Sequence, residues 1–459
     1  MVFFSFQFDR QRVKMKQIIG ILFILLTINS VFAQNPIGPA GVYIPDPSAH
    51  VWKDGKLYVY GSADESTNYY CSHKHHVLST SNMKTWKLTE NSFVSKGQGD
   101  QVSYSDDFLY APDVQYKNGI YYLYYCLSSA SDNEGVATST SPTGPFINGK
   151  VLYTKGINQI DPCVFIDTDG QAYYIWGQFA AKVAKLKPNM TEIDTLTIKD
   201  RVLTESEHHF HEGGYMVKRK GIYYFVYAGL DKTGSANCIS YSTAKSPFGP
   251  FKYGGIIITN EHCDPGNWNN HGSIVEFKDQ WYVFYHRSTH GTSFMRRACV
   301  EPIFFNKDGS INEVEMTSQG AGNPLSAFEK IEAERGCLLL GNVRIEAFDM
   351  DHEKLTKINN GDKACYKYID FGNGADSVTI RIAAKQKPCI LKFNVGVFEK
   401  QTLAEVPIPG NGDGKIWQTI TVKANAAVKG IHALWLQFEG EGVNCYDLDW
   451  FMFSNRSIQ

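Results

Sequence analysis

Short apolar segments separated by tight polar turns recur along the first two thirds of the chain. Each unit is an apolar strand, a polar turn and a second strand rich in Tyr and Phe. Three of the turns contain Asp-Gly or Asn-Gly, which favours a hairpin because both central residues tolerate positive φ. The five turn positions are Gly55, Gly119, Gly170, Gly221 and Gln280. Five units, each with several strands, predict a five-bladed β-propeller over residues 34–320. A β-sandwich with fortuitous repetition is the alternative.

The pattern changes after Pro302, where the repeat loosens. From about Phe328 the chain consists of short alternating strands, which predict a separate β-sandwich of the jelly-roll kind over residues 328–459. The fold class is therefore expected to be all-β, with a propeller followed by a sandwich.

The first 33 residues do not fit either domain. They carry four basic residues, then an apolar run from Ile18 to Ile28, then Val-Phe-Ala before Gln34. This is the pattern of a signal peptide cleaved near Ala33, and it predicts export to the periplasm or the cell exterior. A membrane anchor is the alternative, but the run is about half of the ~20 residues that a spanning helix needs.

Composition and charge argue against some kinds of binding partner. The 459 residues carry 45 basic and 47 acidic side chains without a basic block, which argues against a nucleic-acid surface. The 26 Tyr, 28 Phe and 8 Trp agree with a strand-rich fold. The ten cysteines form no C-x-x-C pair, so disulfide pairing stays open. No membrane span is expected after the leader, and a monomer is the default.

Ionisable residues recur in phase with the repeat. Nine residues before the turn stand Asp46, Asp161, Glu212 and His271. The second unit departs from this rule, because position 110 is Tyr and its acid, Asp113, stands six residues before the turn. Equal offsets in a rotational repeat mean equivalent places on the innermost strands, so these side chains should converge on one axis. An Asp before Pro that merely caps a turn is the alternative.

Carboxylates that converge on one axis repel one another and raise one another's pKa, so such a cluster lowers stability. Clusters of this kind are typical of functional sites. Two carboxyl groups with separated pKa values are what glycoside hydrolysis requires: one protonates the leaving oxygen and the other activates water or attacks.

The motifs resemble glycoside hydrolase family 43, whose members are five-bladed propellers that cleave arabinose- and xylose-containing plant polysaccharides with inversion. The similar motifs are the early Asp-Pro, Ala111-Pro-Asp113, the Ile-Asp-Pro-x-x-Phe at 160–165, Glu-Gly at 212–213 and the late His-Gly. The resemblance implies that Asp46 is the general base, Glu212 the general acid and Asp161 the residue that orients Glu212 and tunes its pKa. It places His271 in a central channel, where a calcium ion or a water network is held.

Further residues follow from the same resemblance. Asp113 is expected to be an accessory substrate-binding residue, and His211 is expected to line the pocket beside Glu212. No organic cofactor is implied. Arg296 and Arg297 are expected to be solvated, and contact with the substrate is the alternative.

The C-terminal part resembles a family 6 carbohydrate-binding module in Ile331-Glu-Ala-Glu334 and in residues 358–362, 430–438 and 447–451. The resemblance implies that Glu334 and Asp449 help to hold a structural calcium and that Trp417 and Asn444 contact sugar. Lys357 stands where a ring is expected, and an ammonium group cannot stack on a sugar, so sugar binding at that cleft stays open.

The expected function is that of an exported, inverting, exo-acting α-L-arabinofuranosidase with a carbohydrate substrate. A β-xylosidase is the alternative within the family. A non-catalytic glycan-binding propeller is the alternative from a different class.

Overall fold

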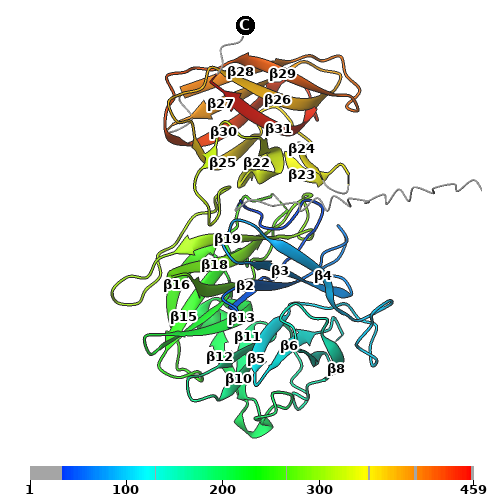
Figure 1. The fold of residues 1–459 in the computed structure, drawn as a ribbon, viewed down its shortest axis with the longest axis vertical. Coiled ribbons are helices and arrows are strands. Elements are labelled where there is room, and N and C mark those ends of the chain that lie inside the picture. The colour runs from blue at the N-terminus through cyan, green and yellow to red at the C-terminus, as the bar shows by residue number, and fades with distance from the viewer. Residues whose placement is uncertain (1–33, 130, 265, 350–351, 397–400, 456–459) are drawn as a thin grey trace, which may run out of the picture. The chain divides into compact units, whose positions relative to one another are not determined.

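The computed structural model describes residues 34–129, 131–264, 266–349, 352–396 and 401–455. The predicted signal peptide lies outside these residues. Strands dominate, and the single α-helix of the described residues is the one-turn α1 (Glu205–His208). Two 3-10 turns, η1 (Thr195–Thr197) and η2 (Ala333–Arg335), complete the helical elements there. The prediction of an all-β protein is confirmed (Figure 1).

Five antiparallel sheets follow one another along the first part of the chain, each built from strands that are consecutive in sequence. The first sheet contains β1 (Ser48–Val51), β2 (Leu57–Ser62), β3 (Lys74–Thr80) and β4 (Lys87–Val94). The second contains β5 (Asp113–Lys117), β6 (Ile120–Cys126), β7 (Glu134–Ser139) and β8 (Ile147–Val151). The third contains β9 (Cys163–Ile166), β10 (Ala172–Trp176), β11 (Ala180–Lys185) and β12 (Lys199–Thr204). The fourth contains β13 (Phe210–Arg219), β14 (Ile222–Gly229), β15 (Cys238–Ala244) and β16 (Lys252–Thr259). The fifth contains β17 (Ser273–Phe277), β18 (Gln280–Arg287) and β19 (Arg297–Ile303).

The first strands of the five sheets form a closed ring. β1 contacts β5, β5 contacts β9, β9 contacts β13, β13 contacts β17, and β17 returns to β1. This is the arrangement of a five-bladed propeller, in which each sheet is a blade and its first strand lines the axis. The predicted propeller is confirmed.

Residues ahead of the first blade close the ring along β19. The amide of Ile37 donates to the carbonyl of Ala298 at 2.9 Å, and the amide of Val300 donates to Asn35 Oδ1 at 2.9 Å. The fifth blade, which has three strands in the described chain, is thus covered at its outer edge by the segment that precedes β1.

The hairpins between first and second strands have the backbone that their sequences predict. Asn118 and Gly119 both have positive φ, of 53° and 88°, and Lys220 and Gly221 repeat this with 49° and 77°. In the fifth blade the turn lies on residues 278–279, one position earlier than predicted, because Phe277 pairs directly with Gln280. The side chain of residue 280 therefore belongs to the second strand.

The second part of the chain is a sandwich of two sheets. One contains β20 (Leu325–Ser326), β22 (Leu338–Leu340), β25 (Lys363–Asp370), β27 (Cys389–Val395), β28 (Gln401–Ile408) and β30 (Ile431–Gly440). The other contains β21 (Ile331–Glu332), β23 (Arg344–Ala347), β24 (Glu353–Thr356), β26 (Ser377–Ala384), β29 (Trp417–Lys423) and β31 (Tyr446–Ser454). An apolar core that includes Leu391, Leu436 and Phe451 separates them. β20 already belongs to the sandwich, slightly ahead of the predicted residue 328.

Buried polar contacts join the two parts. Arg297 is 1% exposed and forms an ion pair with Glu353 of β24, whose Oε1 also accepts the hydroxyl of Tyr43 at 3.0 Å. The amide of His290 donates to Ile345 O at 2.9 Å. The expectation that Arg297 is solvated is wrong, because its charge is needed to neutralise a carboxylate in the contact between the two parts.

All ten cysteines are buried thiols without disulfide bonds. Among the described residues, no helix has the length and apolar character that a membrane crossing requires.

Candidate active site

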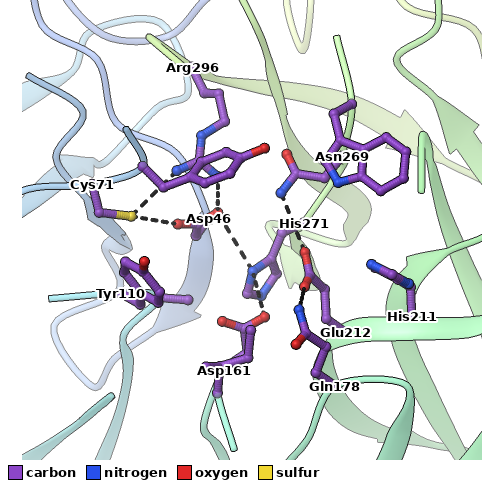
Figure 2. A pocket seen from close by; sticks show the side chains of 14 residues that line it. Asp46, Cys71, Tyr110, Asp161, Gln178, His211, Glu212, Asn269, His271 and Arg296 are labelled. Carbon is purple, nitrogen blue, oxygen red and sulfur yellow. Dashed lines mark hydrogen bonds and ion pairs between the residues drawn. The ribbon is translucent and has the colours of Figure 1, made fainter. Parts of the chain in front are cut away.

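A cavity of about 290 Å³ opens on the propeller axis. Its lining includes the residue at the equivalent position of every blade: Asp46, Tyr110, Asp161, Glu212 and His271. Figure 2 shows the three carboxylates gathered around His271. The structure therefore brings together the four residues that the in-phase pattern singled out, and it adds Tyr110 from the blade that seemed to break the pattern.

Two of the carboxylates stand on the same unusual backbone. Asp46 has φ of 57° and Asp161 has φ of 61°, and each precedes a proline that leads into the first strand of its blade. A positive φ is uncommon outside glycine and is retained where the surrounding structure demands it. Here it places both side chains at the end of an inner strand, facing the cavity (Figure 2).

Asp46 is held as a carboxylate. Its Oδ1 accepts from Arg296 Nη1 at 2.9 Å, and its Oδ2 accepts from Ser62 Oγ at 2.8 Å. Burial acts to raise the pKa of Asp46, but Arg296, His271 and His286 outweigh burial and leave the pKa below its usual value. An ionised Asp46 can accept a proton from water, as a general base must.

Arg296 is the functional residue that sequence reasoning placed wrongly, since it was expected to be solvated. It is 2% exposed and lines the cavity. Its Nε and Nη2 donate to the two oxygens of Asp64 at 2.9 and 3.0 Å, which leaves Nη1 for Asp46. The planar fork of a guanidinium suits this double role. Asp64 fixes the orientation of Arg296, and Arg296 in turn keeps Asp46 ionised.

Asp161 and Glu212 form the opposite side of the site. Burial, followed by the charges of Glu212 and Asp46, raises the pKa of Asp161 well above its ordinary value. Glu212 Oε2 accepts from Gln178 Nε2 at 2.8 Å, and Oε1 accepts from Asn269 Nδ2 at 3.4 Å. A carboxyl group that is buried near other carboxylates, as Asp161 is, favours its protonated form, so this side of the site can hold a proton.

His271 lies between the two groups of carboxylates. Its Nδ1 is 3.6 Å from Asp46 Oδ1 and 3.8 Å from Asp161 Oδ2. Burial lowers the pKa of His271 despite these neighbours. Gly213 makes room for the ring, because a Cβ on Gly213 would lie 2.6 Å from His271 Cδ2.

The predicted calcium at His271 is not matched by a set of protein ligands. Calcium takes six to eight oxygen ligands, whereas Asp46 Oδ1 is already bound by Arg296. In the part of the chain that the structure describes, no group of three or more His, Cys, Asp or Glu side chains is arranged to hold a metal.

Asp113 does not line the cavity, contrary to the prediction of an accessory substrate contact. It is 1% exposed and tied to its neighbours. Its Oδ1 contacts Ser48 Oγ and His50 Nε2, each at 2.6 Å, and its Oδ2 accepts from the amide of Val164 at 2.7 Å. The physical reason is the position along the strand. Tyr110 precedes β5 and faces the cavity, whereas Asp113, three residues later, is the first residue of β5 and bonds to residues of β1 and β9.

Aromatic side chains stand beside Glu212. His211 lines the cavity as predicted, and its Nδ1 is 2.8 Å from Glu205 Oε1. The ring of His211 meets Trp268 and Phe179 edge-on, with centroids 6.1 and 5.3 Å away. Trp268 and Phe179 are 42% and 55% exposed, so apolar ring surface remains available at this edge.

The predicted sugar-binding pair of the second part is separated into two environments. Trp417 packs against the Phe348 ring at 5.1 Å and under the Arg381 guanidinium at 5.0 Å, so these neighbours use its ring surface. Asn444 lines a different cavity together with Lys357. The prediction that Trp417 and Asn444 grip one sugar is not supported by these contacts.

The predicted calcium ligands of this part are engaged otherwise. Asp449 forms an ion pair with Arg381. Glu334 is buried, its Oε1 is 3.9 Å from Arg335 Nε, and burial raises its pKa to about 8. In the described residues neither side chain belongs to a group of three or more His, Cys, Asp or Glu side chains placed to hold a metal, so the calcium in this part stays a prediction.

Comparison with known families agrees with the geometry. Residues 33–311 match the family model described as "Glycosyl hydrolases family 43". Residues 333–455 match the model described as "Carbohydrate binding module (family 6)".

Individual relatives cover most of the chain. A "Xylosidase/arabinosidase" of Thermoclostridium stercorarium is 30% identical over 89% of this chain and 96% of its own length. An "Arabinoxylan arabinofuranohydrolase" of Bacillus subtilis (strain 168) is 26% identical over 90% of each. A crystal structure of a family 43 arabinoxylan arabinofuranohydrolase from Bacillus subtilis in complex with cellotetraose has a TM-score of 0.54 at 25% identity, covering 93% of this chain and 99% of that one.

The five-bladed ring, the carboxylates on its axis and these matches lead to one assignment. The chain belongs to glycosyl hydrolases family 43 and is a glycosidase.

Proposed function

We propose that the protein is an exported, inverting exo-glycosidase that removes terminal α-L-arabinofuranosyl units from arabinose- and xylose-containing plant polysaccharides. The observation that carries the proposal is the placement of Asp46, Asp161 and Glu212 around one small cavity on the axis. Asp46 sits with Arg296, and Glu212 sits with Gln178 and Asn269 on the opposite side (Figure 2).

In the proposed reaction Asp46 takes a proton from a water molecule as that water attacks the anomeric carbon. Glu212 gives a proton to the glycosidic oxygen, and the bond between that oxygen and the anomeric carbon breaks. Asp161 interacts electrostatically with Glu212, because the charge of Glu212 is among the causes that raise the pKa of Asp161, and we assign to Asp161 the role of orienting and tuning Glu212. Water attacks from the face opposite the leaving group, so the configuration inverts.

Exo action is supported by the size of the cavity. A volume of about 290 Å³ lies at the small end of ligand pockets and suits one sugar unit better than a run of units. The exposed rings of Trp268 and Phe179 stand against His211, the residue before Glu212, where a departing sugar chain would rest.

A β-xylosidase is the second candidate. A "Beta-xylosidase" of Xylanibacter ruminicola is 28% identical over 60% of this chain, and the Thermoclostridium relative carries both activities in its name. Arabinofuranosyl and xylosyl groups are both pentosyl groups, so a pocket of this size does not by itself separate them.

The deciding experiment is a screen of the purified protein on aryl α-L-arabinofuranoside, β-D-xyloside and β-galactofuranoside, with NMR of the first-formed anomer. We expect fastest turnover of the arabinofuranoside and a product of inverted configuration. A retained anomer would contradict the role of Asp46, and failure to cleave any glycoside would favour a propeller that only binds glycans.

Export rests on the basic and apolar pattern of residues 1–33. The mature protein is expected to begin at Gln34, which N-terminal sequencing of protein from the cell exterior or periplasm would test. A calcium ion near His271 would have to be held largely by water, and activity after dialysis against a chelator tests whether it is needed.

A further inference from the structure

A second cavity, of about 420 Å³, lies away from the propeller axis. The loop between β18 and β19 contributes His290 and Gly291. The sandwich contributes the remaining lining residues, which are Asn342, Arg344, Lys357, Asn359 and Asn444. None of the residues that line the axial cavity lines this one.

The lining carries positive charge and no carboxylate. Burial lowers the pKa of His290, so the charge near neutral pH comes from Arg344 and Lys357. Two acids stand just behind the wall: Glu346 Oε1 is 2.6 Å from Lys357 Nζ, and Asp264 Oδ2 accepts from the amide of Gly291 at 3.2 Å. The groups that face the cavity are thus two cations, of which Lys357 is paired with Glu346, and three amides, of which that of Asn444 accepts from Lys385 Nζ at 2.5 Å. With Arg344 beside them they suit an anionic ligand that also carries hydroxyls.

Arg344 is fixed in place. Its Nη1 donates to Gly341 O at 3.0 Å and to Val343 O at 2.8 Å. Gly291 has φ of 70°, and a Cβ there would lie 2.7 Å from Arg344 Nε. Glycine at this position therefore lets the propeller loop approach the guanidinium closely, since a side chain there would be strained and would press on Arg344. A planar guanidinium is the preferred partner of a carboxylate.

The amides supply the neutral half of the site. The amide N–H of Asn444 donates to Asn359 Oδ1 at 2.8 Å, which connects the two loops that carry these residues. Side-chain amides offer both donors and acceptors to sugar hydroxyls. Lys357 stands at the place where the resemblance expects a stacking ring, so charge replaces stacking at this position.

We propose that this cavity binds a sugar that carries a carboxylate, that is, a uronic acid unit of a plant polysaccharide. The inference rests on the proposed function only in that the substrate is a glycan. The axial cavity is a poor site for such a unit, because the ionised Asp46 repels a further carboxylate and the guanidinium of Arg296 is already bound by Asp46 and Asp64. The protein would then hold acidic side groups at one site while it cleaves neutral sugars at the other.

The test is calorimetric binding of two probes to the full chain carrying Glu212→Gln, which suppresses hydrolysis. The probes are a xylotetraose with one glucuronic acid branch and the same xylotetraose without it. We expect the branched probe to bind at least tenfold more tightly, and we expect Arg344→Gln and Lys357→Gln each to weaken it about tenfold or more, since hydrogen bonds to charged groups are lost. Lys187→Gln, on the exposed surface of the third blade, is the charge-matched control.

Equal affinity for the two probes overturns the proposal. So does unchanged binding by either cavity variant when its melting temperature shows that it is folded. Inorganic phosphate or sulfate that displaces the branched probe at equal concentration would reassign the cavity to anions in general. Hydrolysis of aryl glycosides by the otherwise unaltered Arg344 and Lys357 variants reports on the proposed function separately, and we expect that hydrolysis to be unaffected.

Discussion

Arg296 donates to Asp46 Oδ1 at 2.9 Å while the rest of its guanidinium is bound by Asp64. Asp64 comes from the first blade and Arg296 from just before the last strand of the fifth, so the two ends of the ring meet at the proposed base. The charge state of Asp46 is therefore set by a residue that also holds the ring together.

Replacing Arg296 with Met should change the pH dependence of activity. With Arg296 present, the pKa of Asp46 lies below its usual value, so Asp46 stays ionised until the pH falls through that lowered pKa. Without Arg296, burial dominates, so the acid limb of the kcat/KM profile should move to higher pH. An unpaired Asp64 should also cost about 3–5 kcal/mol of the free energy of unfolding. Arg201→Met, on the exposed surface of β12, should change neither quantity.

Glu212→Gln should lower kcat/KM by about 10²–10⁴-fold on a substrate with a poor leaving group. The loss should be much smaller with a dinitrophenyl leaving group, which departs without protonation. Glu207→Gln, exposed on the nearby helix α1, serves as the control. An equal loss on both substrates would show that Glu212 is not the acid.

Gly213→Ala and Gly221→Ala form a matched pair. Both glycines have positive φ, of 65° and 77°, so either substitution should cost about 1–2 kcal/mol of unfolding free energy through the backbone. A Cβ at position 213 meets His271 at 2.6 Å, whereas one at position 221 meets nothing within 4 Å. Only Gly213→Ala should lower kcat, by at least about tenfold. Equal activity of the two variants would mean that the position of the His271 ring is unimportant.

Asp113→Ala should act on stability and leave the chemistry nearly intact. It removes the acceptor for Ser48, His50 and Val164, so we expect a loss of about 2–4 kcal/mol in chemical denaturation. The kcat/KM of the folded variant at low temperature should stay within about fivefold of the parent enzyme. A large rise in KM without destabilisation would restore the view that Asp113 contacts substrate.

Glu134→Gln should stabilise the protein increasingly as the pH rises. Glu134 is 1% exposed, and burial raises its pKa from 4.5 to about 8. Between these values the folded protein holds a proton that the unfolded chain has released, so the stability present below the unfolded pKa is lost as pH rises through the folded pKa. Gln cannot ionise. Melting temperatures from pH 5 to pH 9 should diverge in favour of the variant, and parallel curves would contradict the prediction.

The propeller and most of its axial residues could be predicted because the same hairpin pattern recurs in the sequence once for each blade. A nearly constant offset from the hairpin turn places Asp46, Asp161 and Glu212 around one cavity. His271 joins them although the turn of its blade lies one residue earlier, so that it stands eight residues before Asp279. Arg296 carries no such signal, because it precedes the third strand of its blade and not the first, yet its side chain lines the axial cavity and donates to Asp46. Asp113 does not follow this rule, because it stands three residues farther along the chain than Tyr110, and that shift changes both its height on the axis and its neighbours.

The segment that covers β19 has a consequence for how the protein is made. Asn35 Nδ2 donates to the carbonyl of Val300, a residue 265 positions away, and Asn35 is completely buried. Each blade can form its own hairpins early, but the ring cannot close before the fifth blade has left the ribosome. Contacts of such separation slow folding and expose strand edges meanwhile. We therefore expect nascent chains that end before residue 300 to remain protease-sensitive, with resistance gained in one step once the last blade is complete.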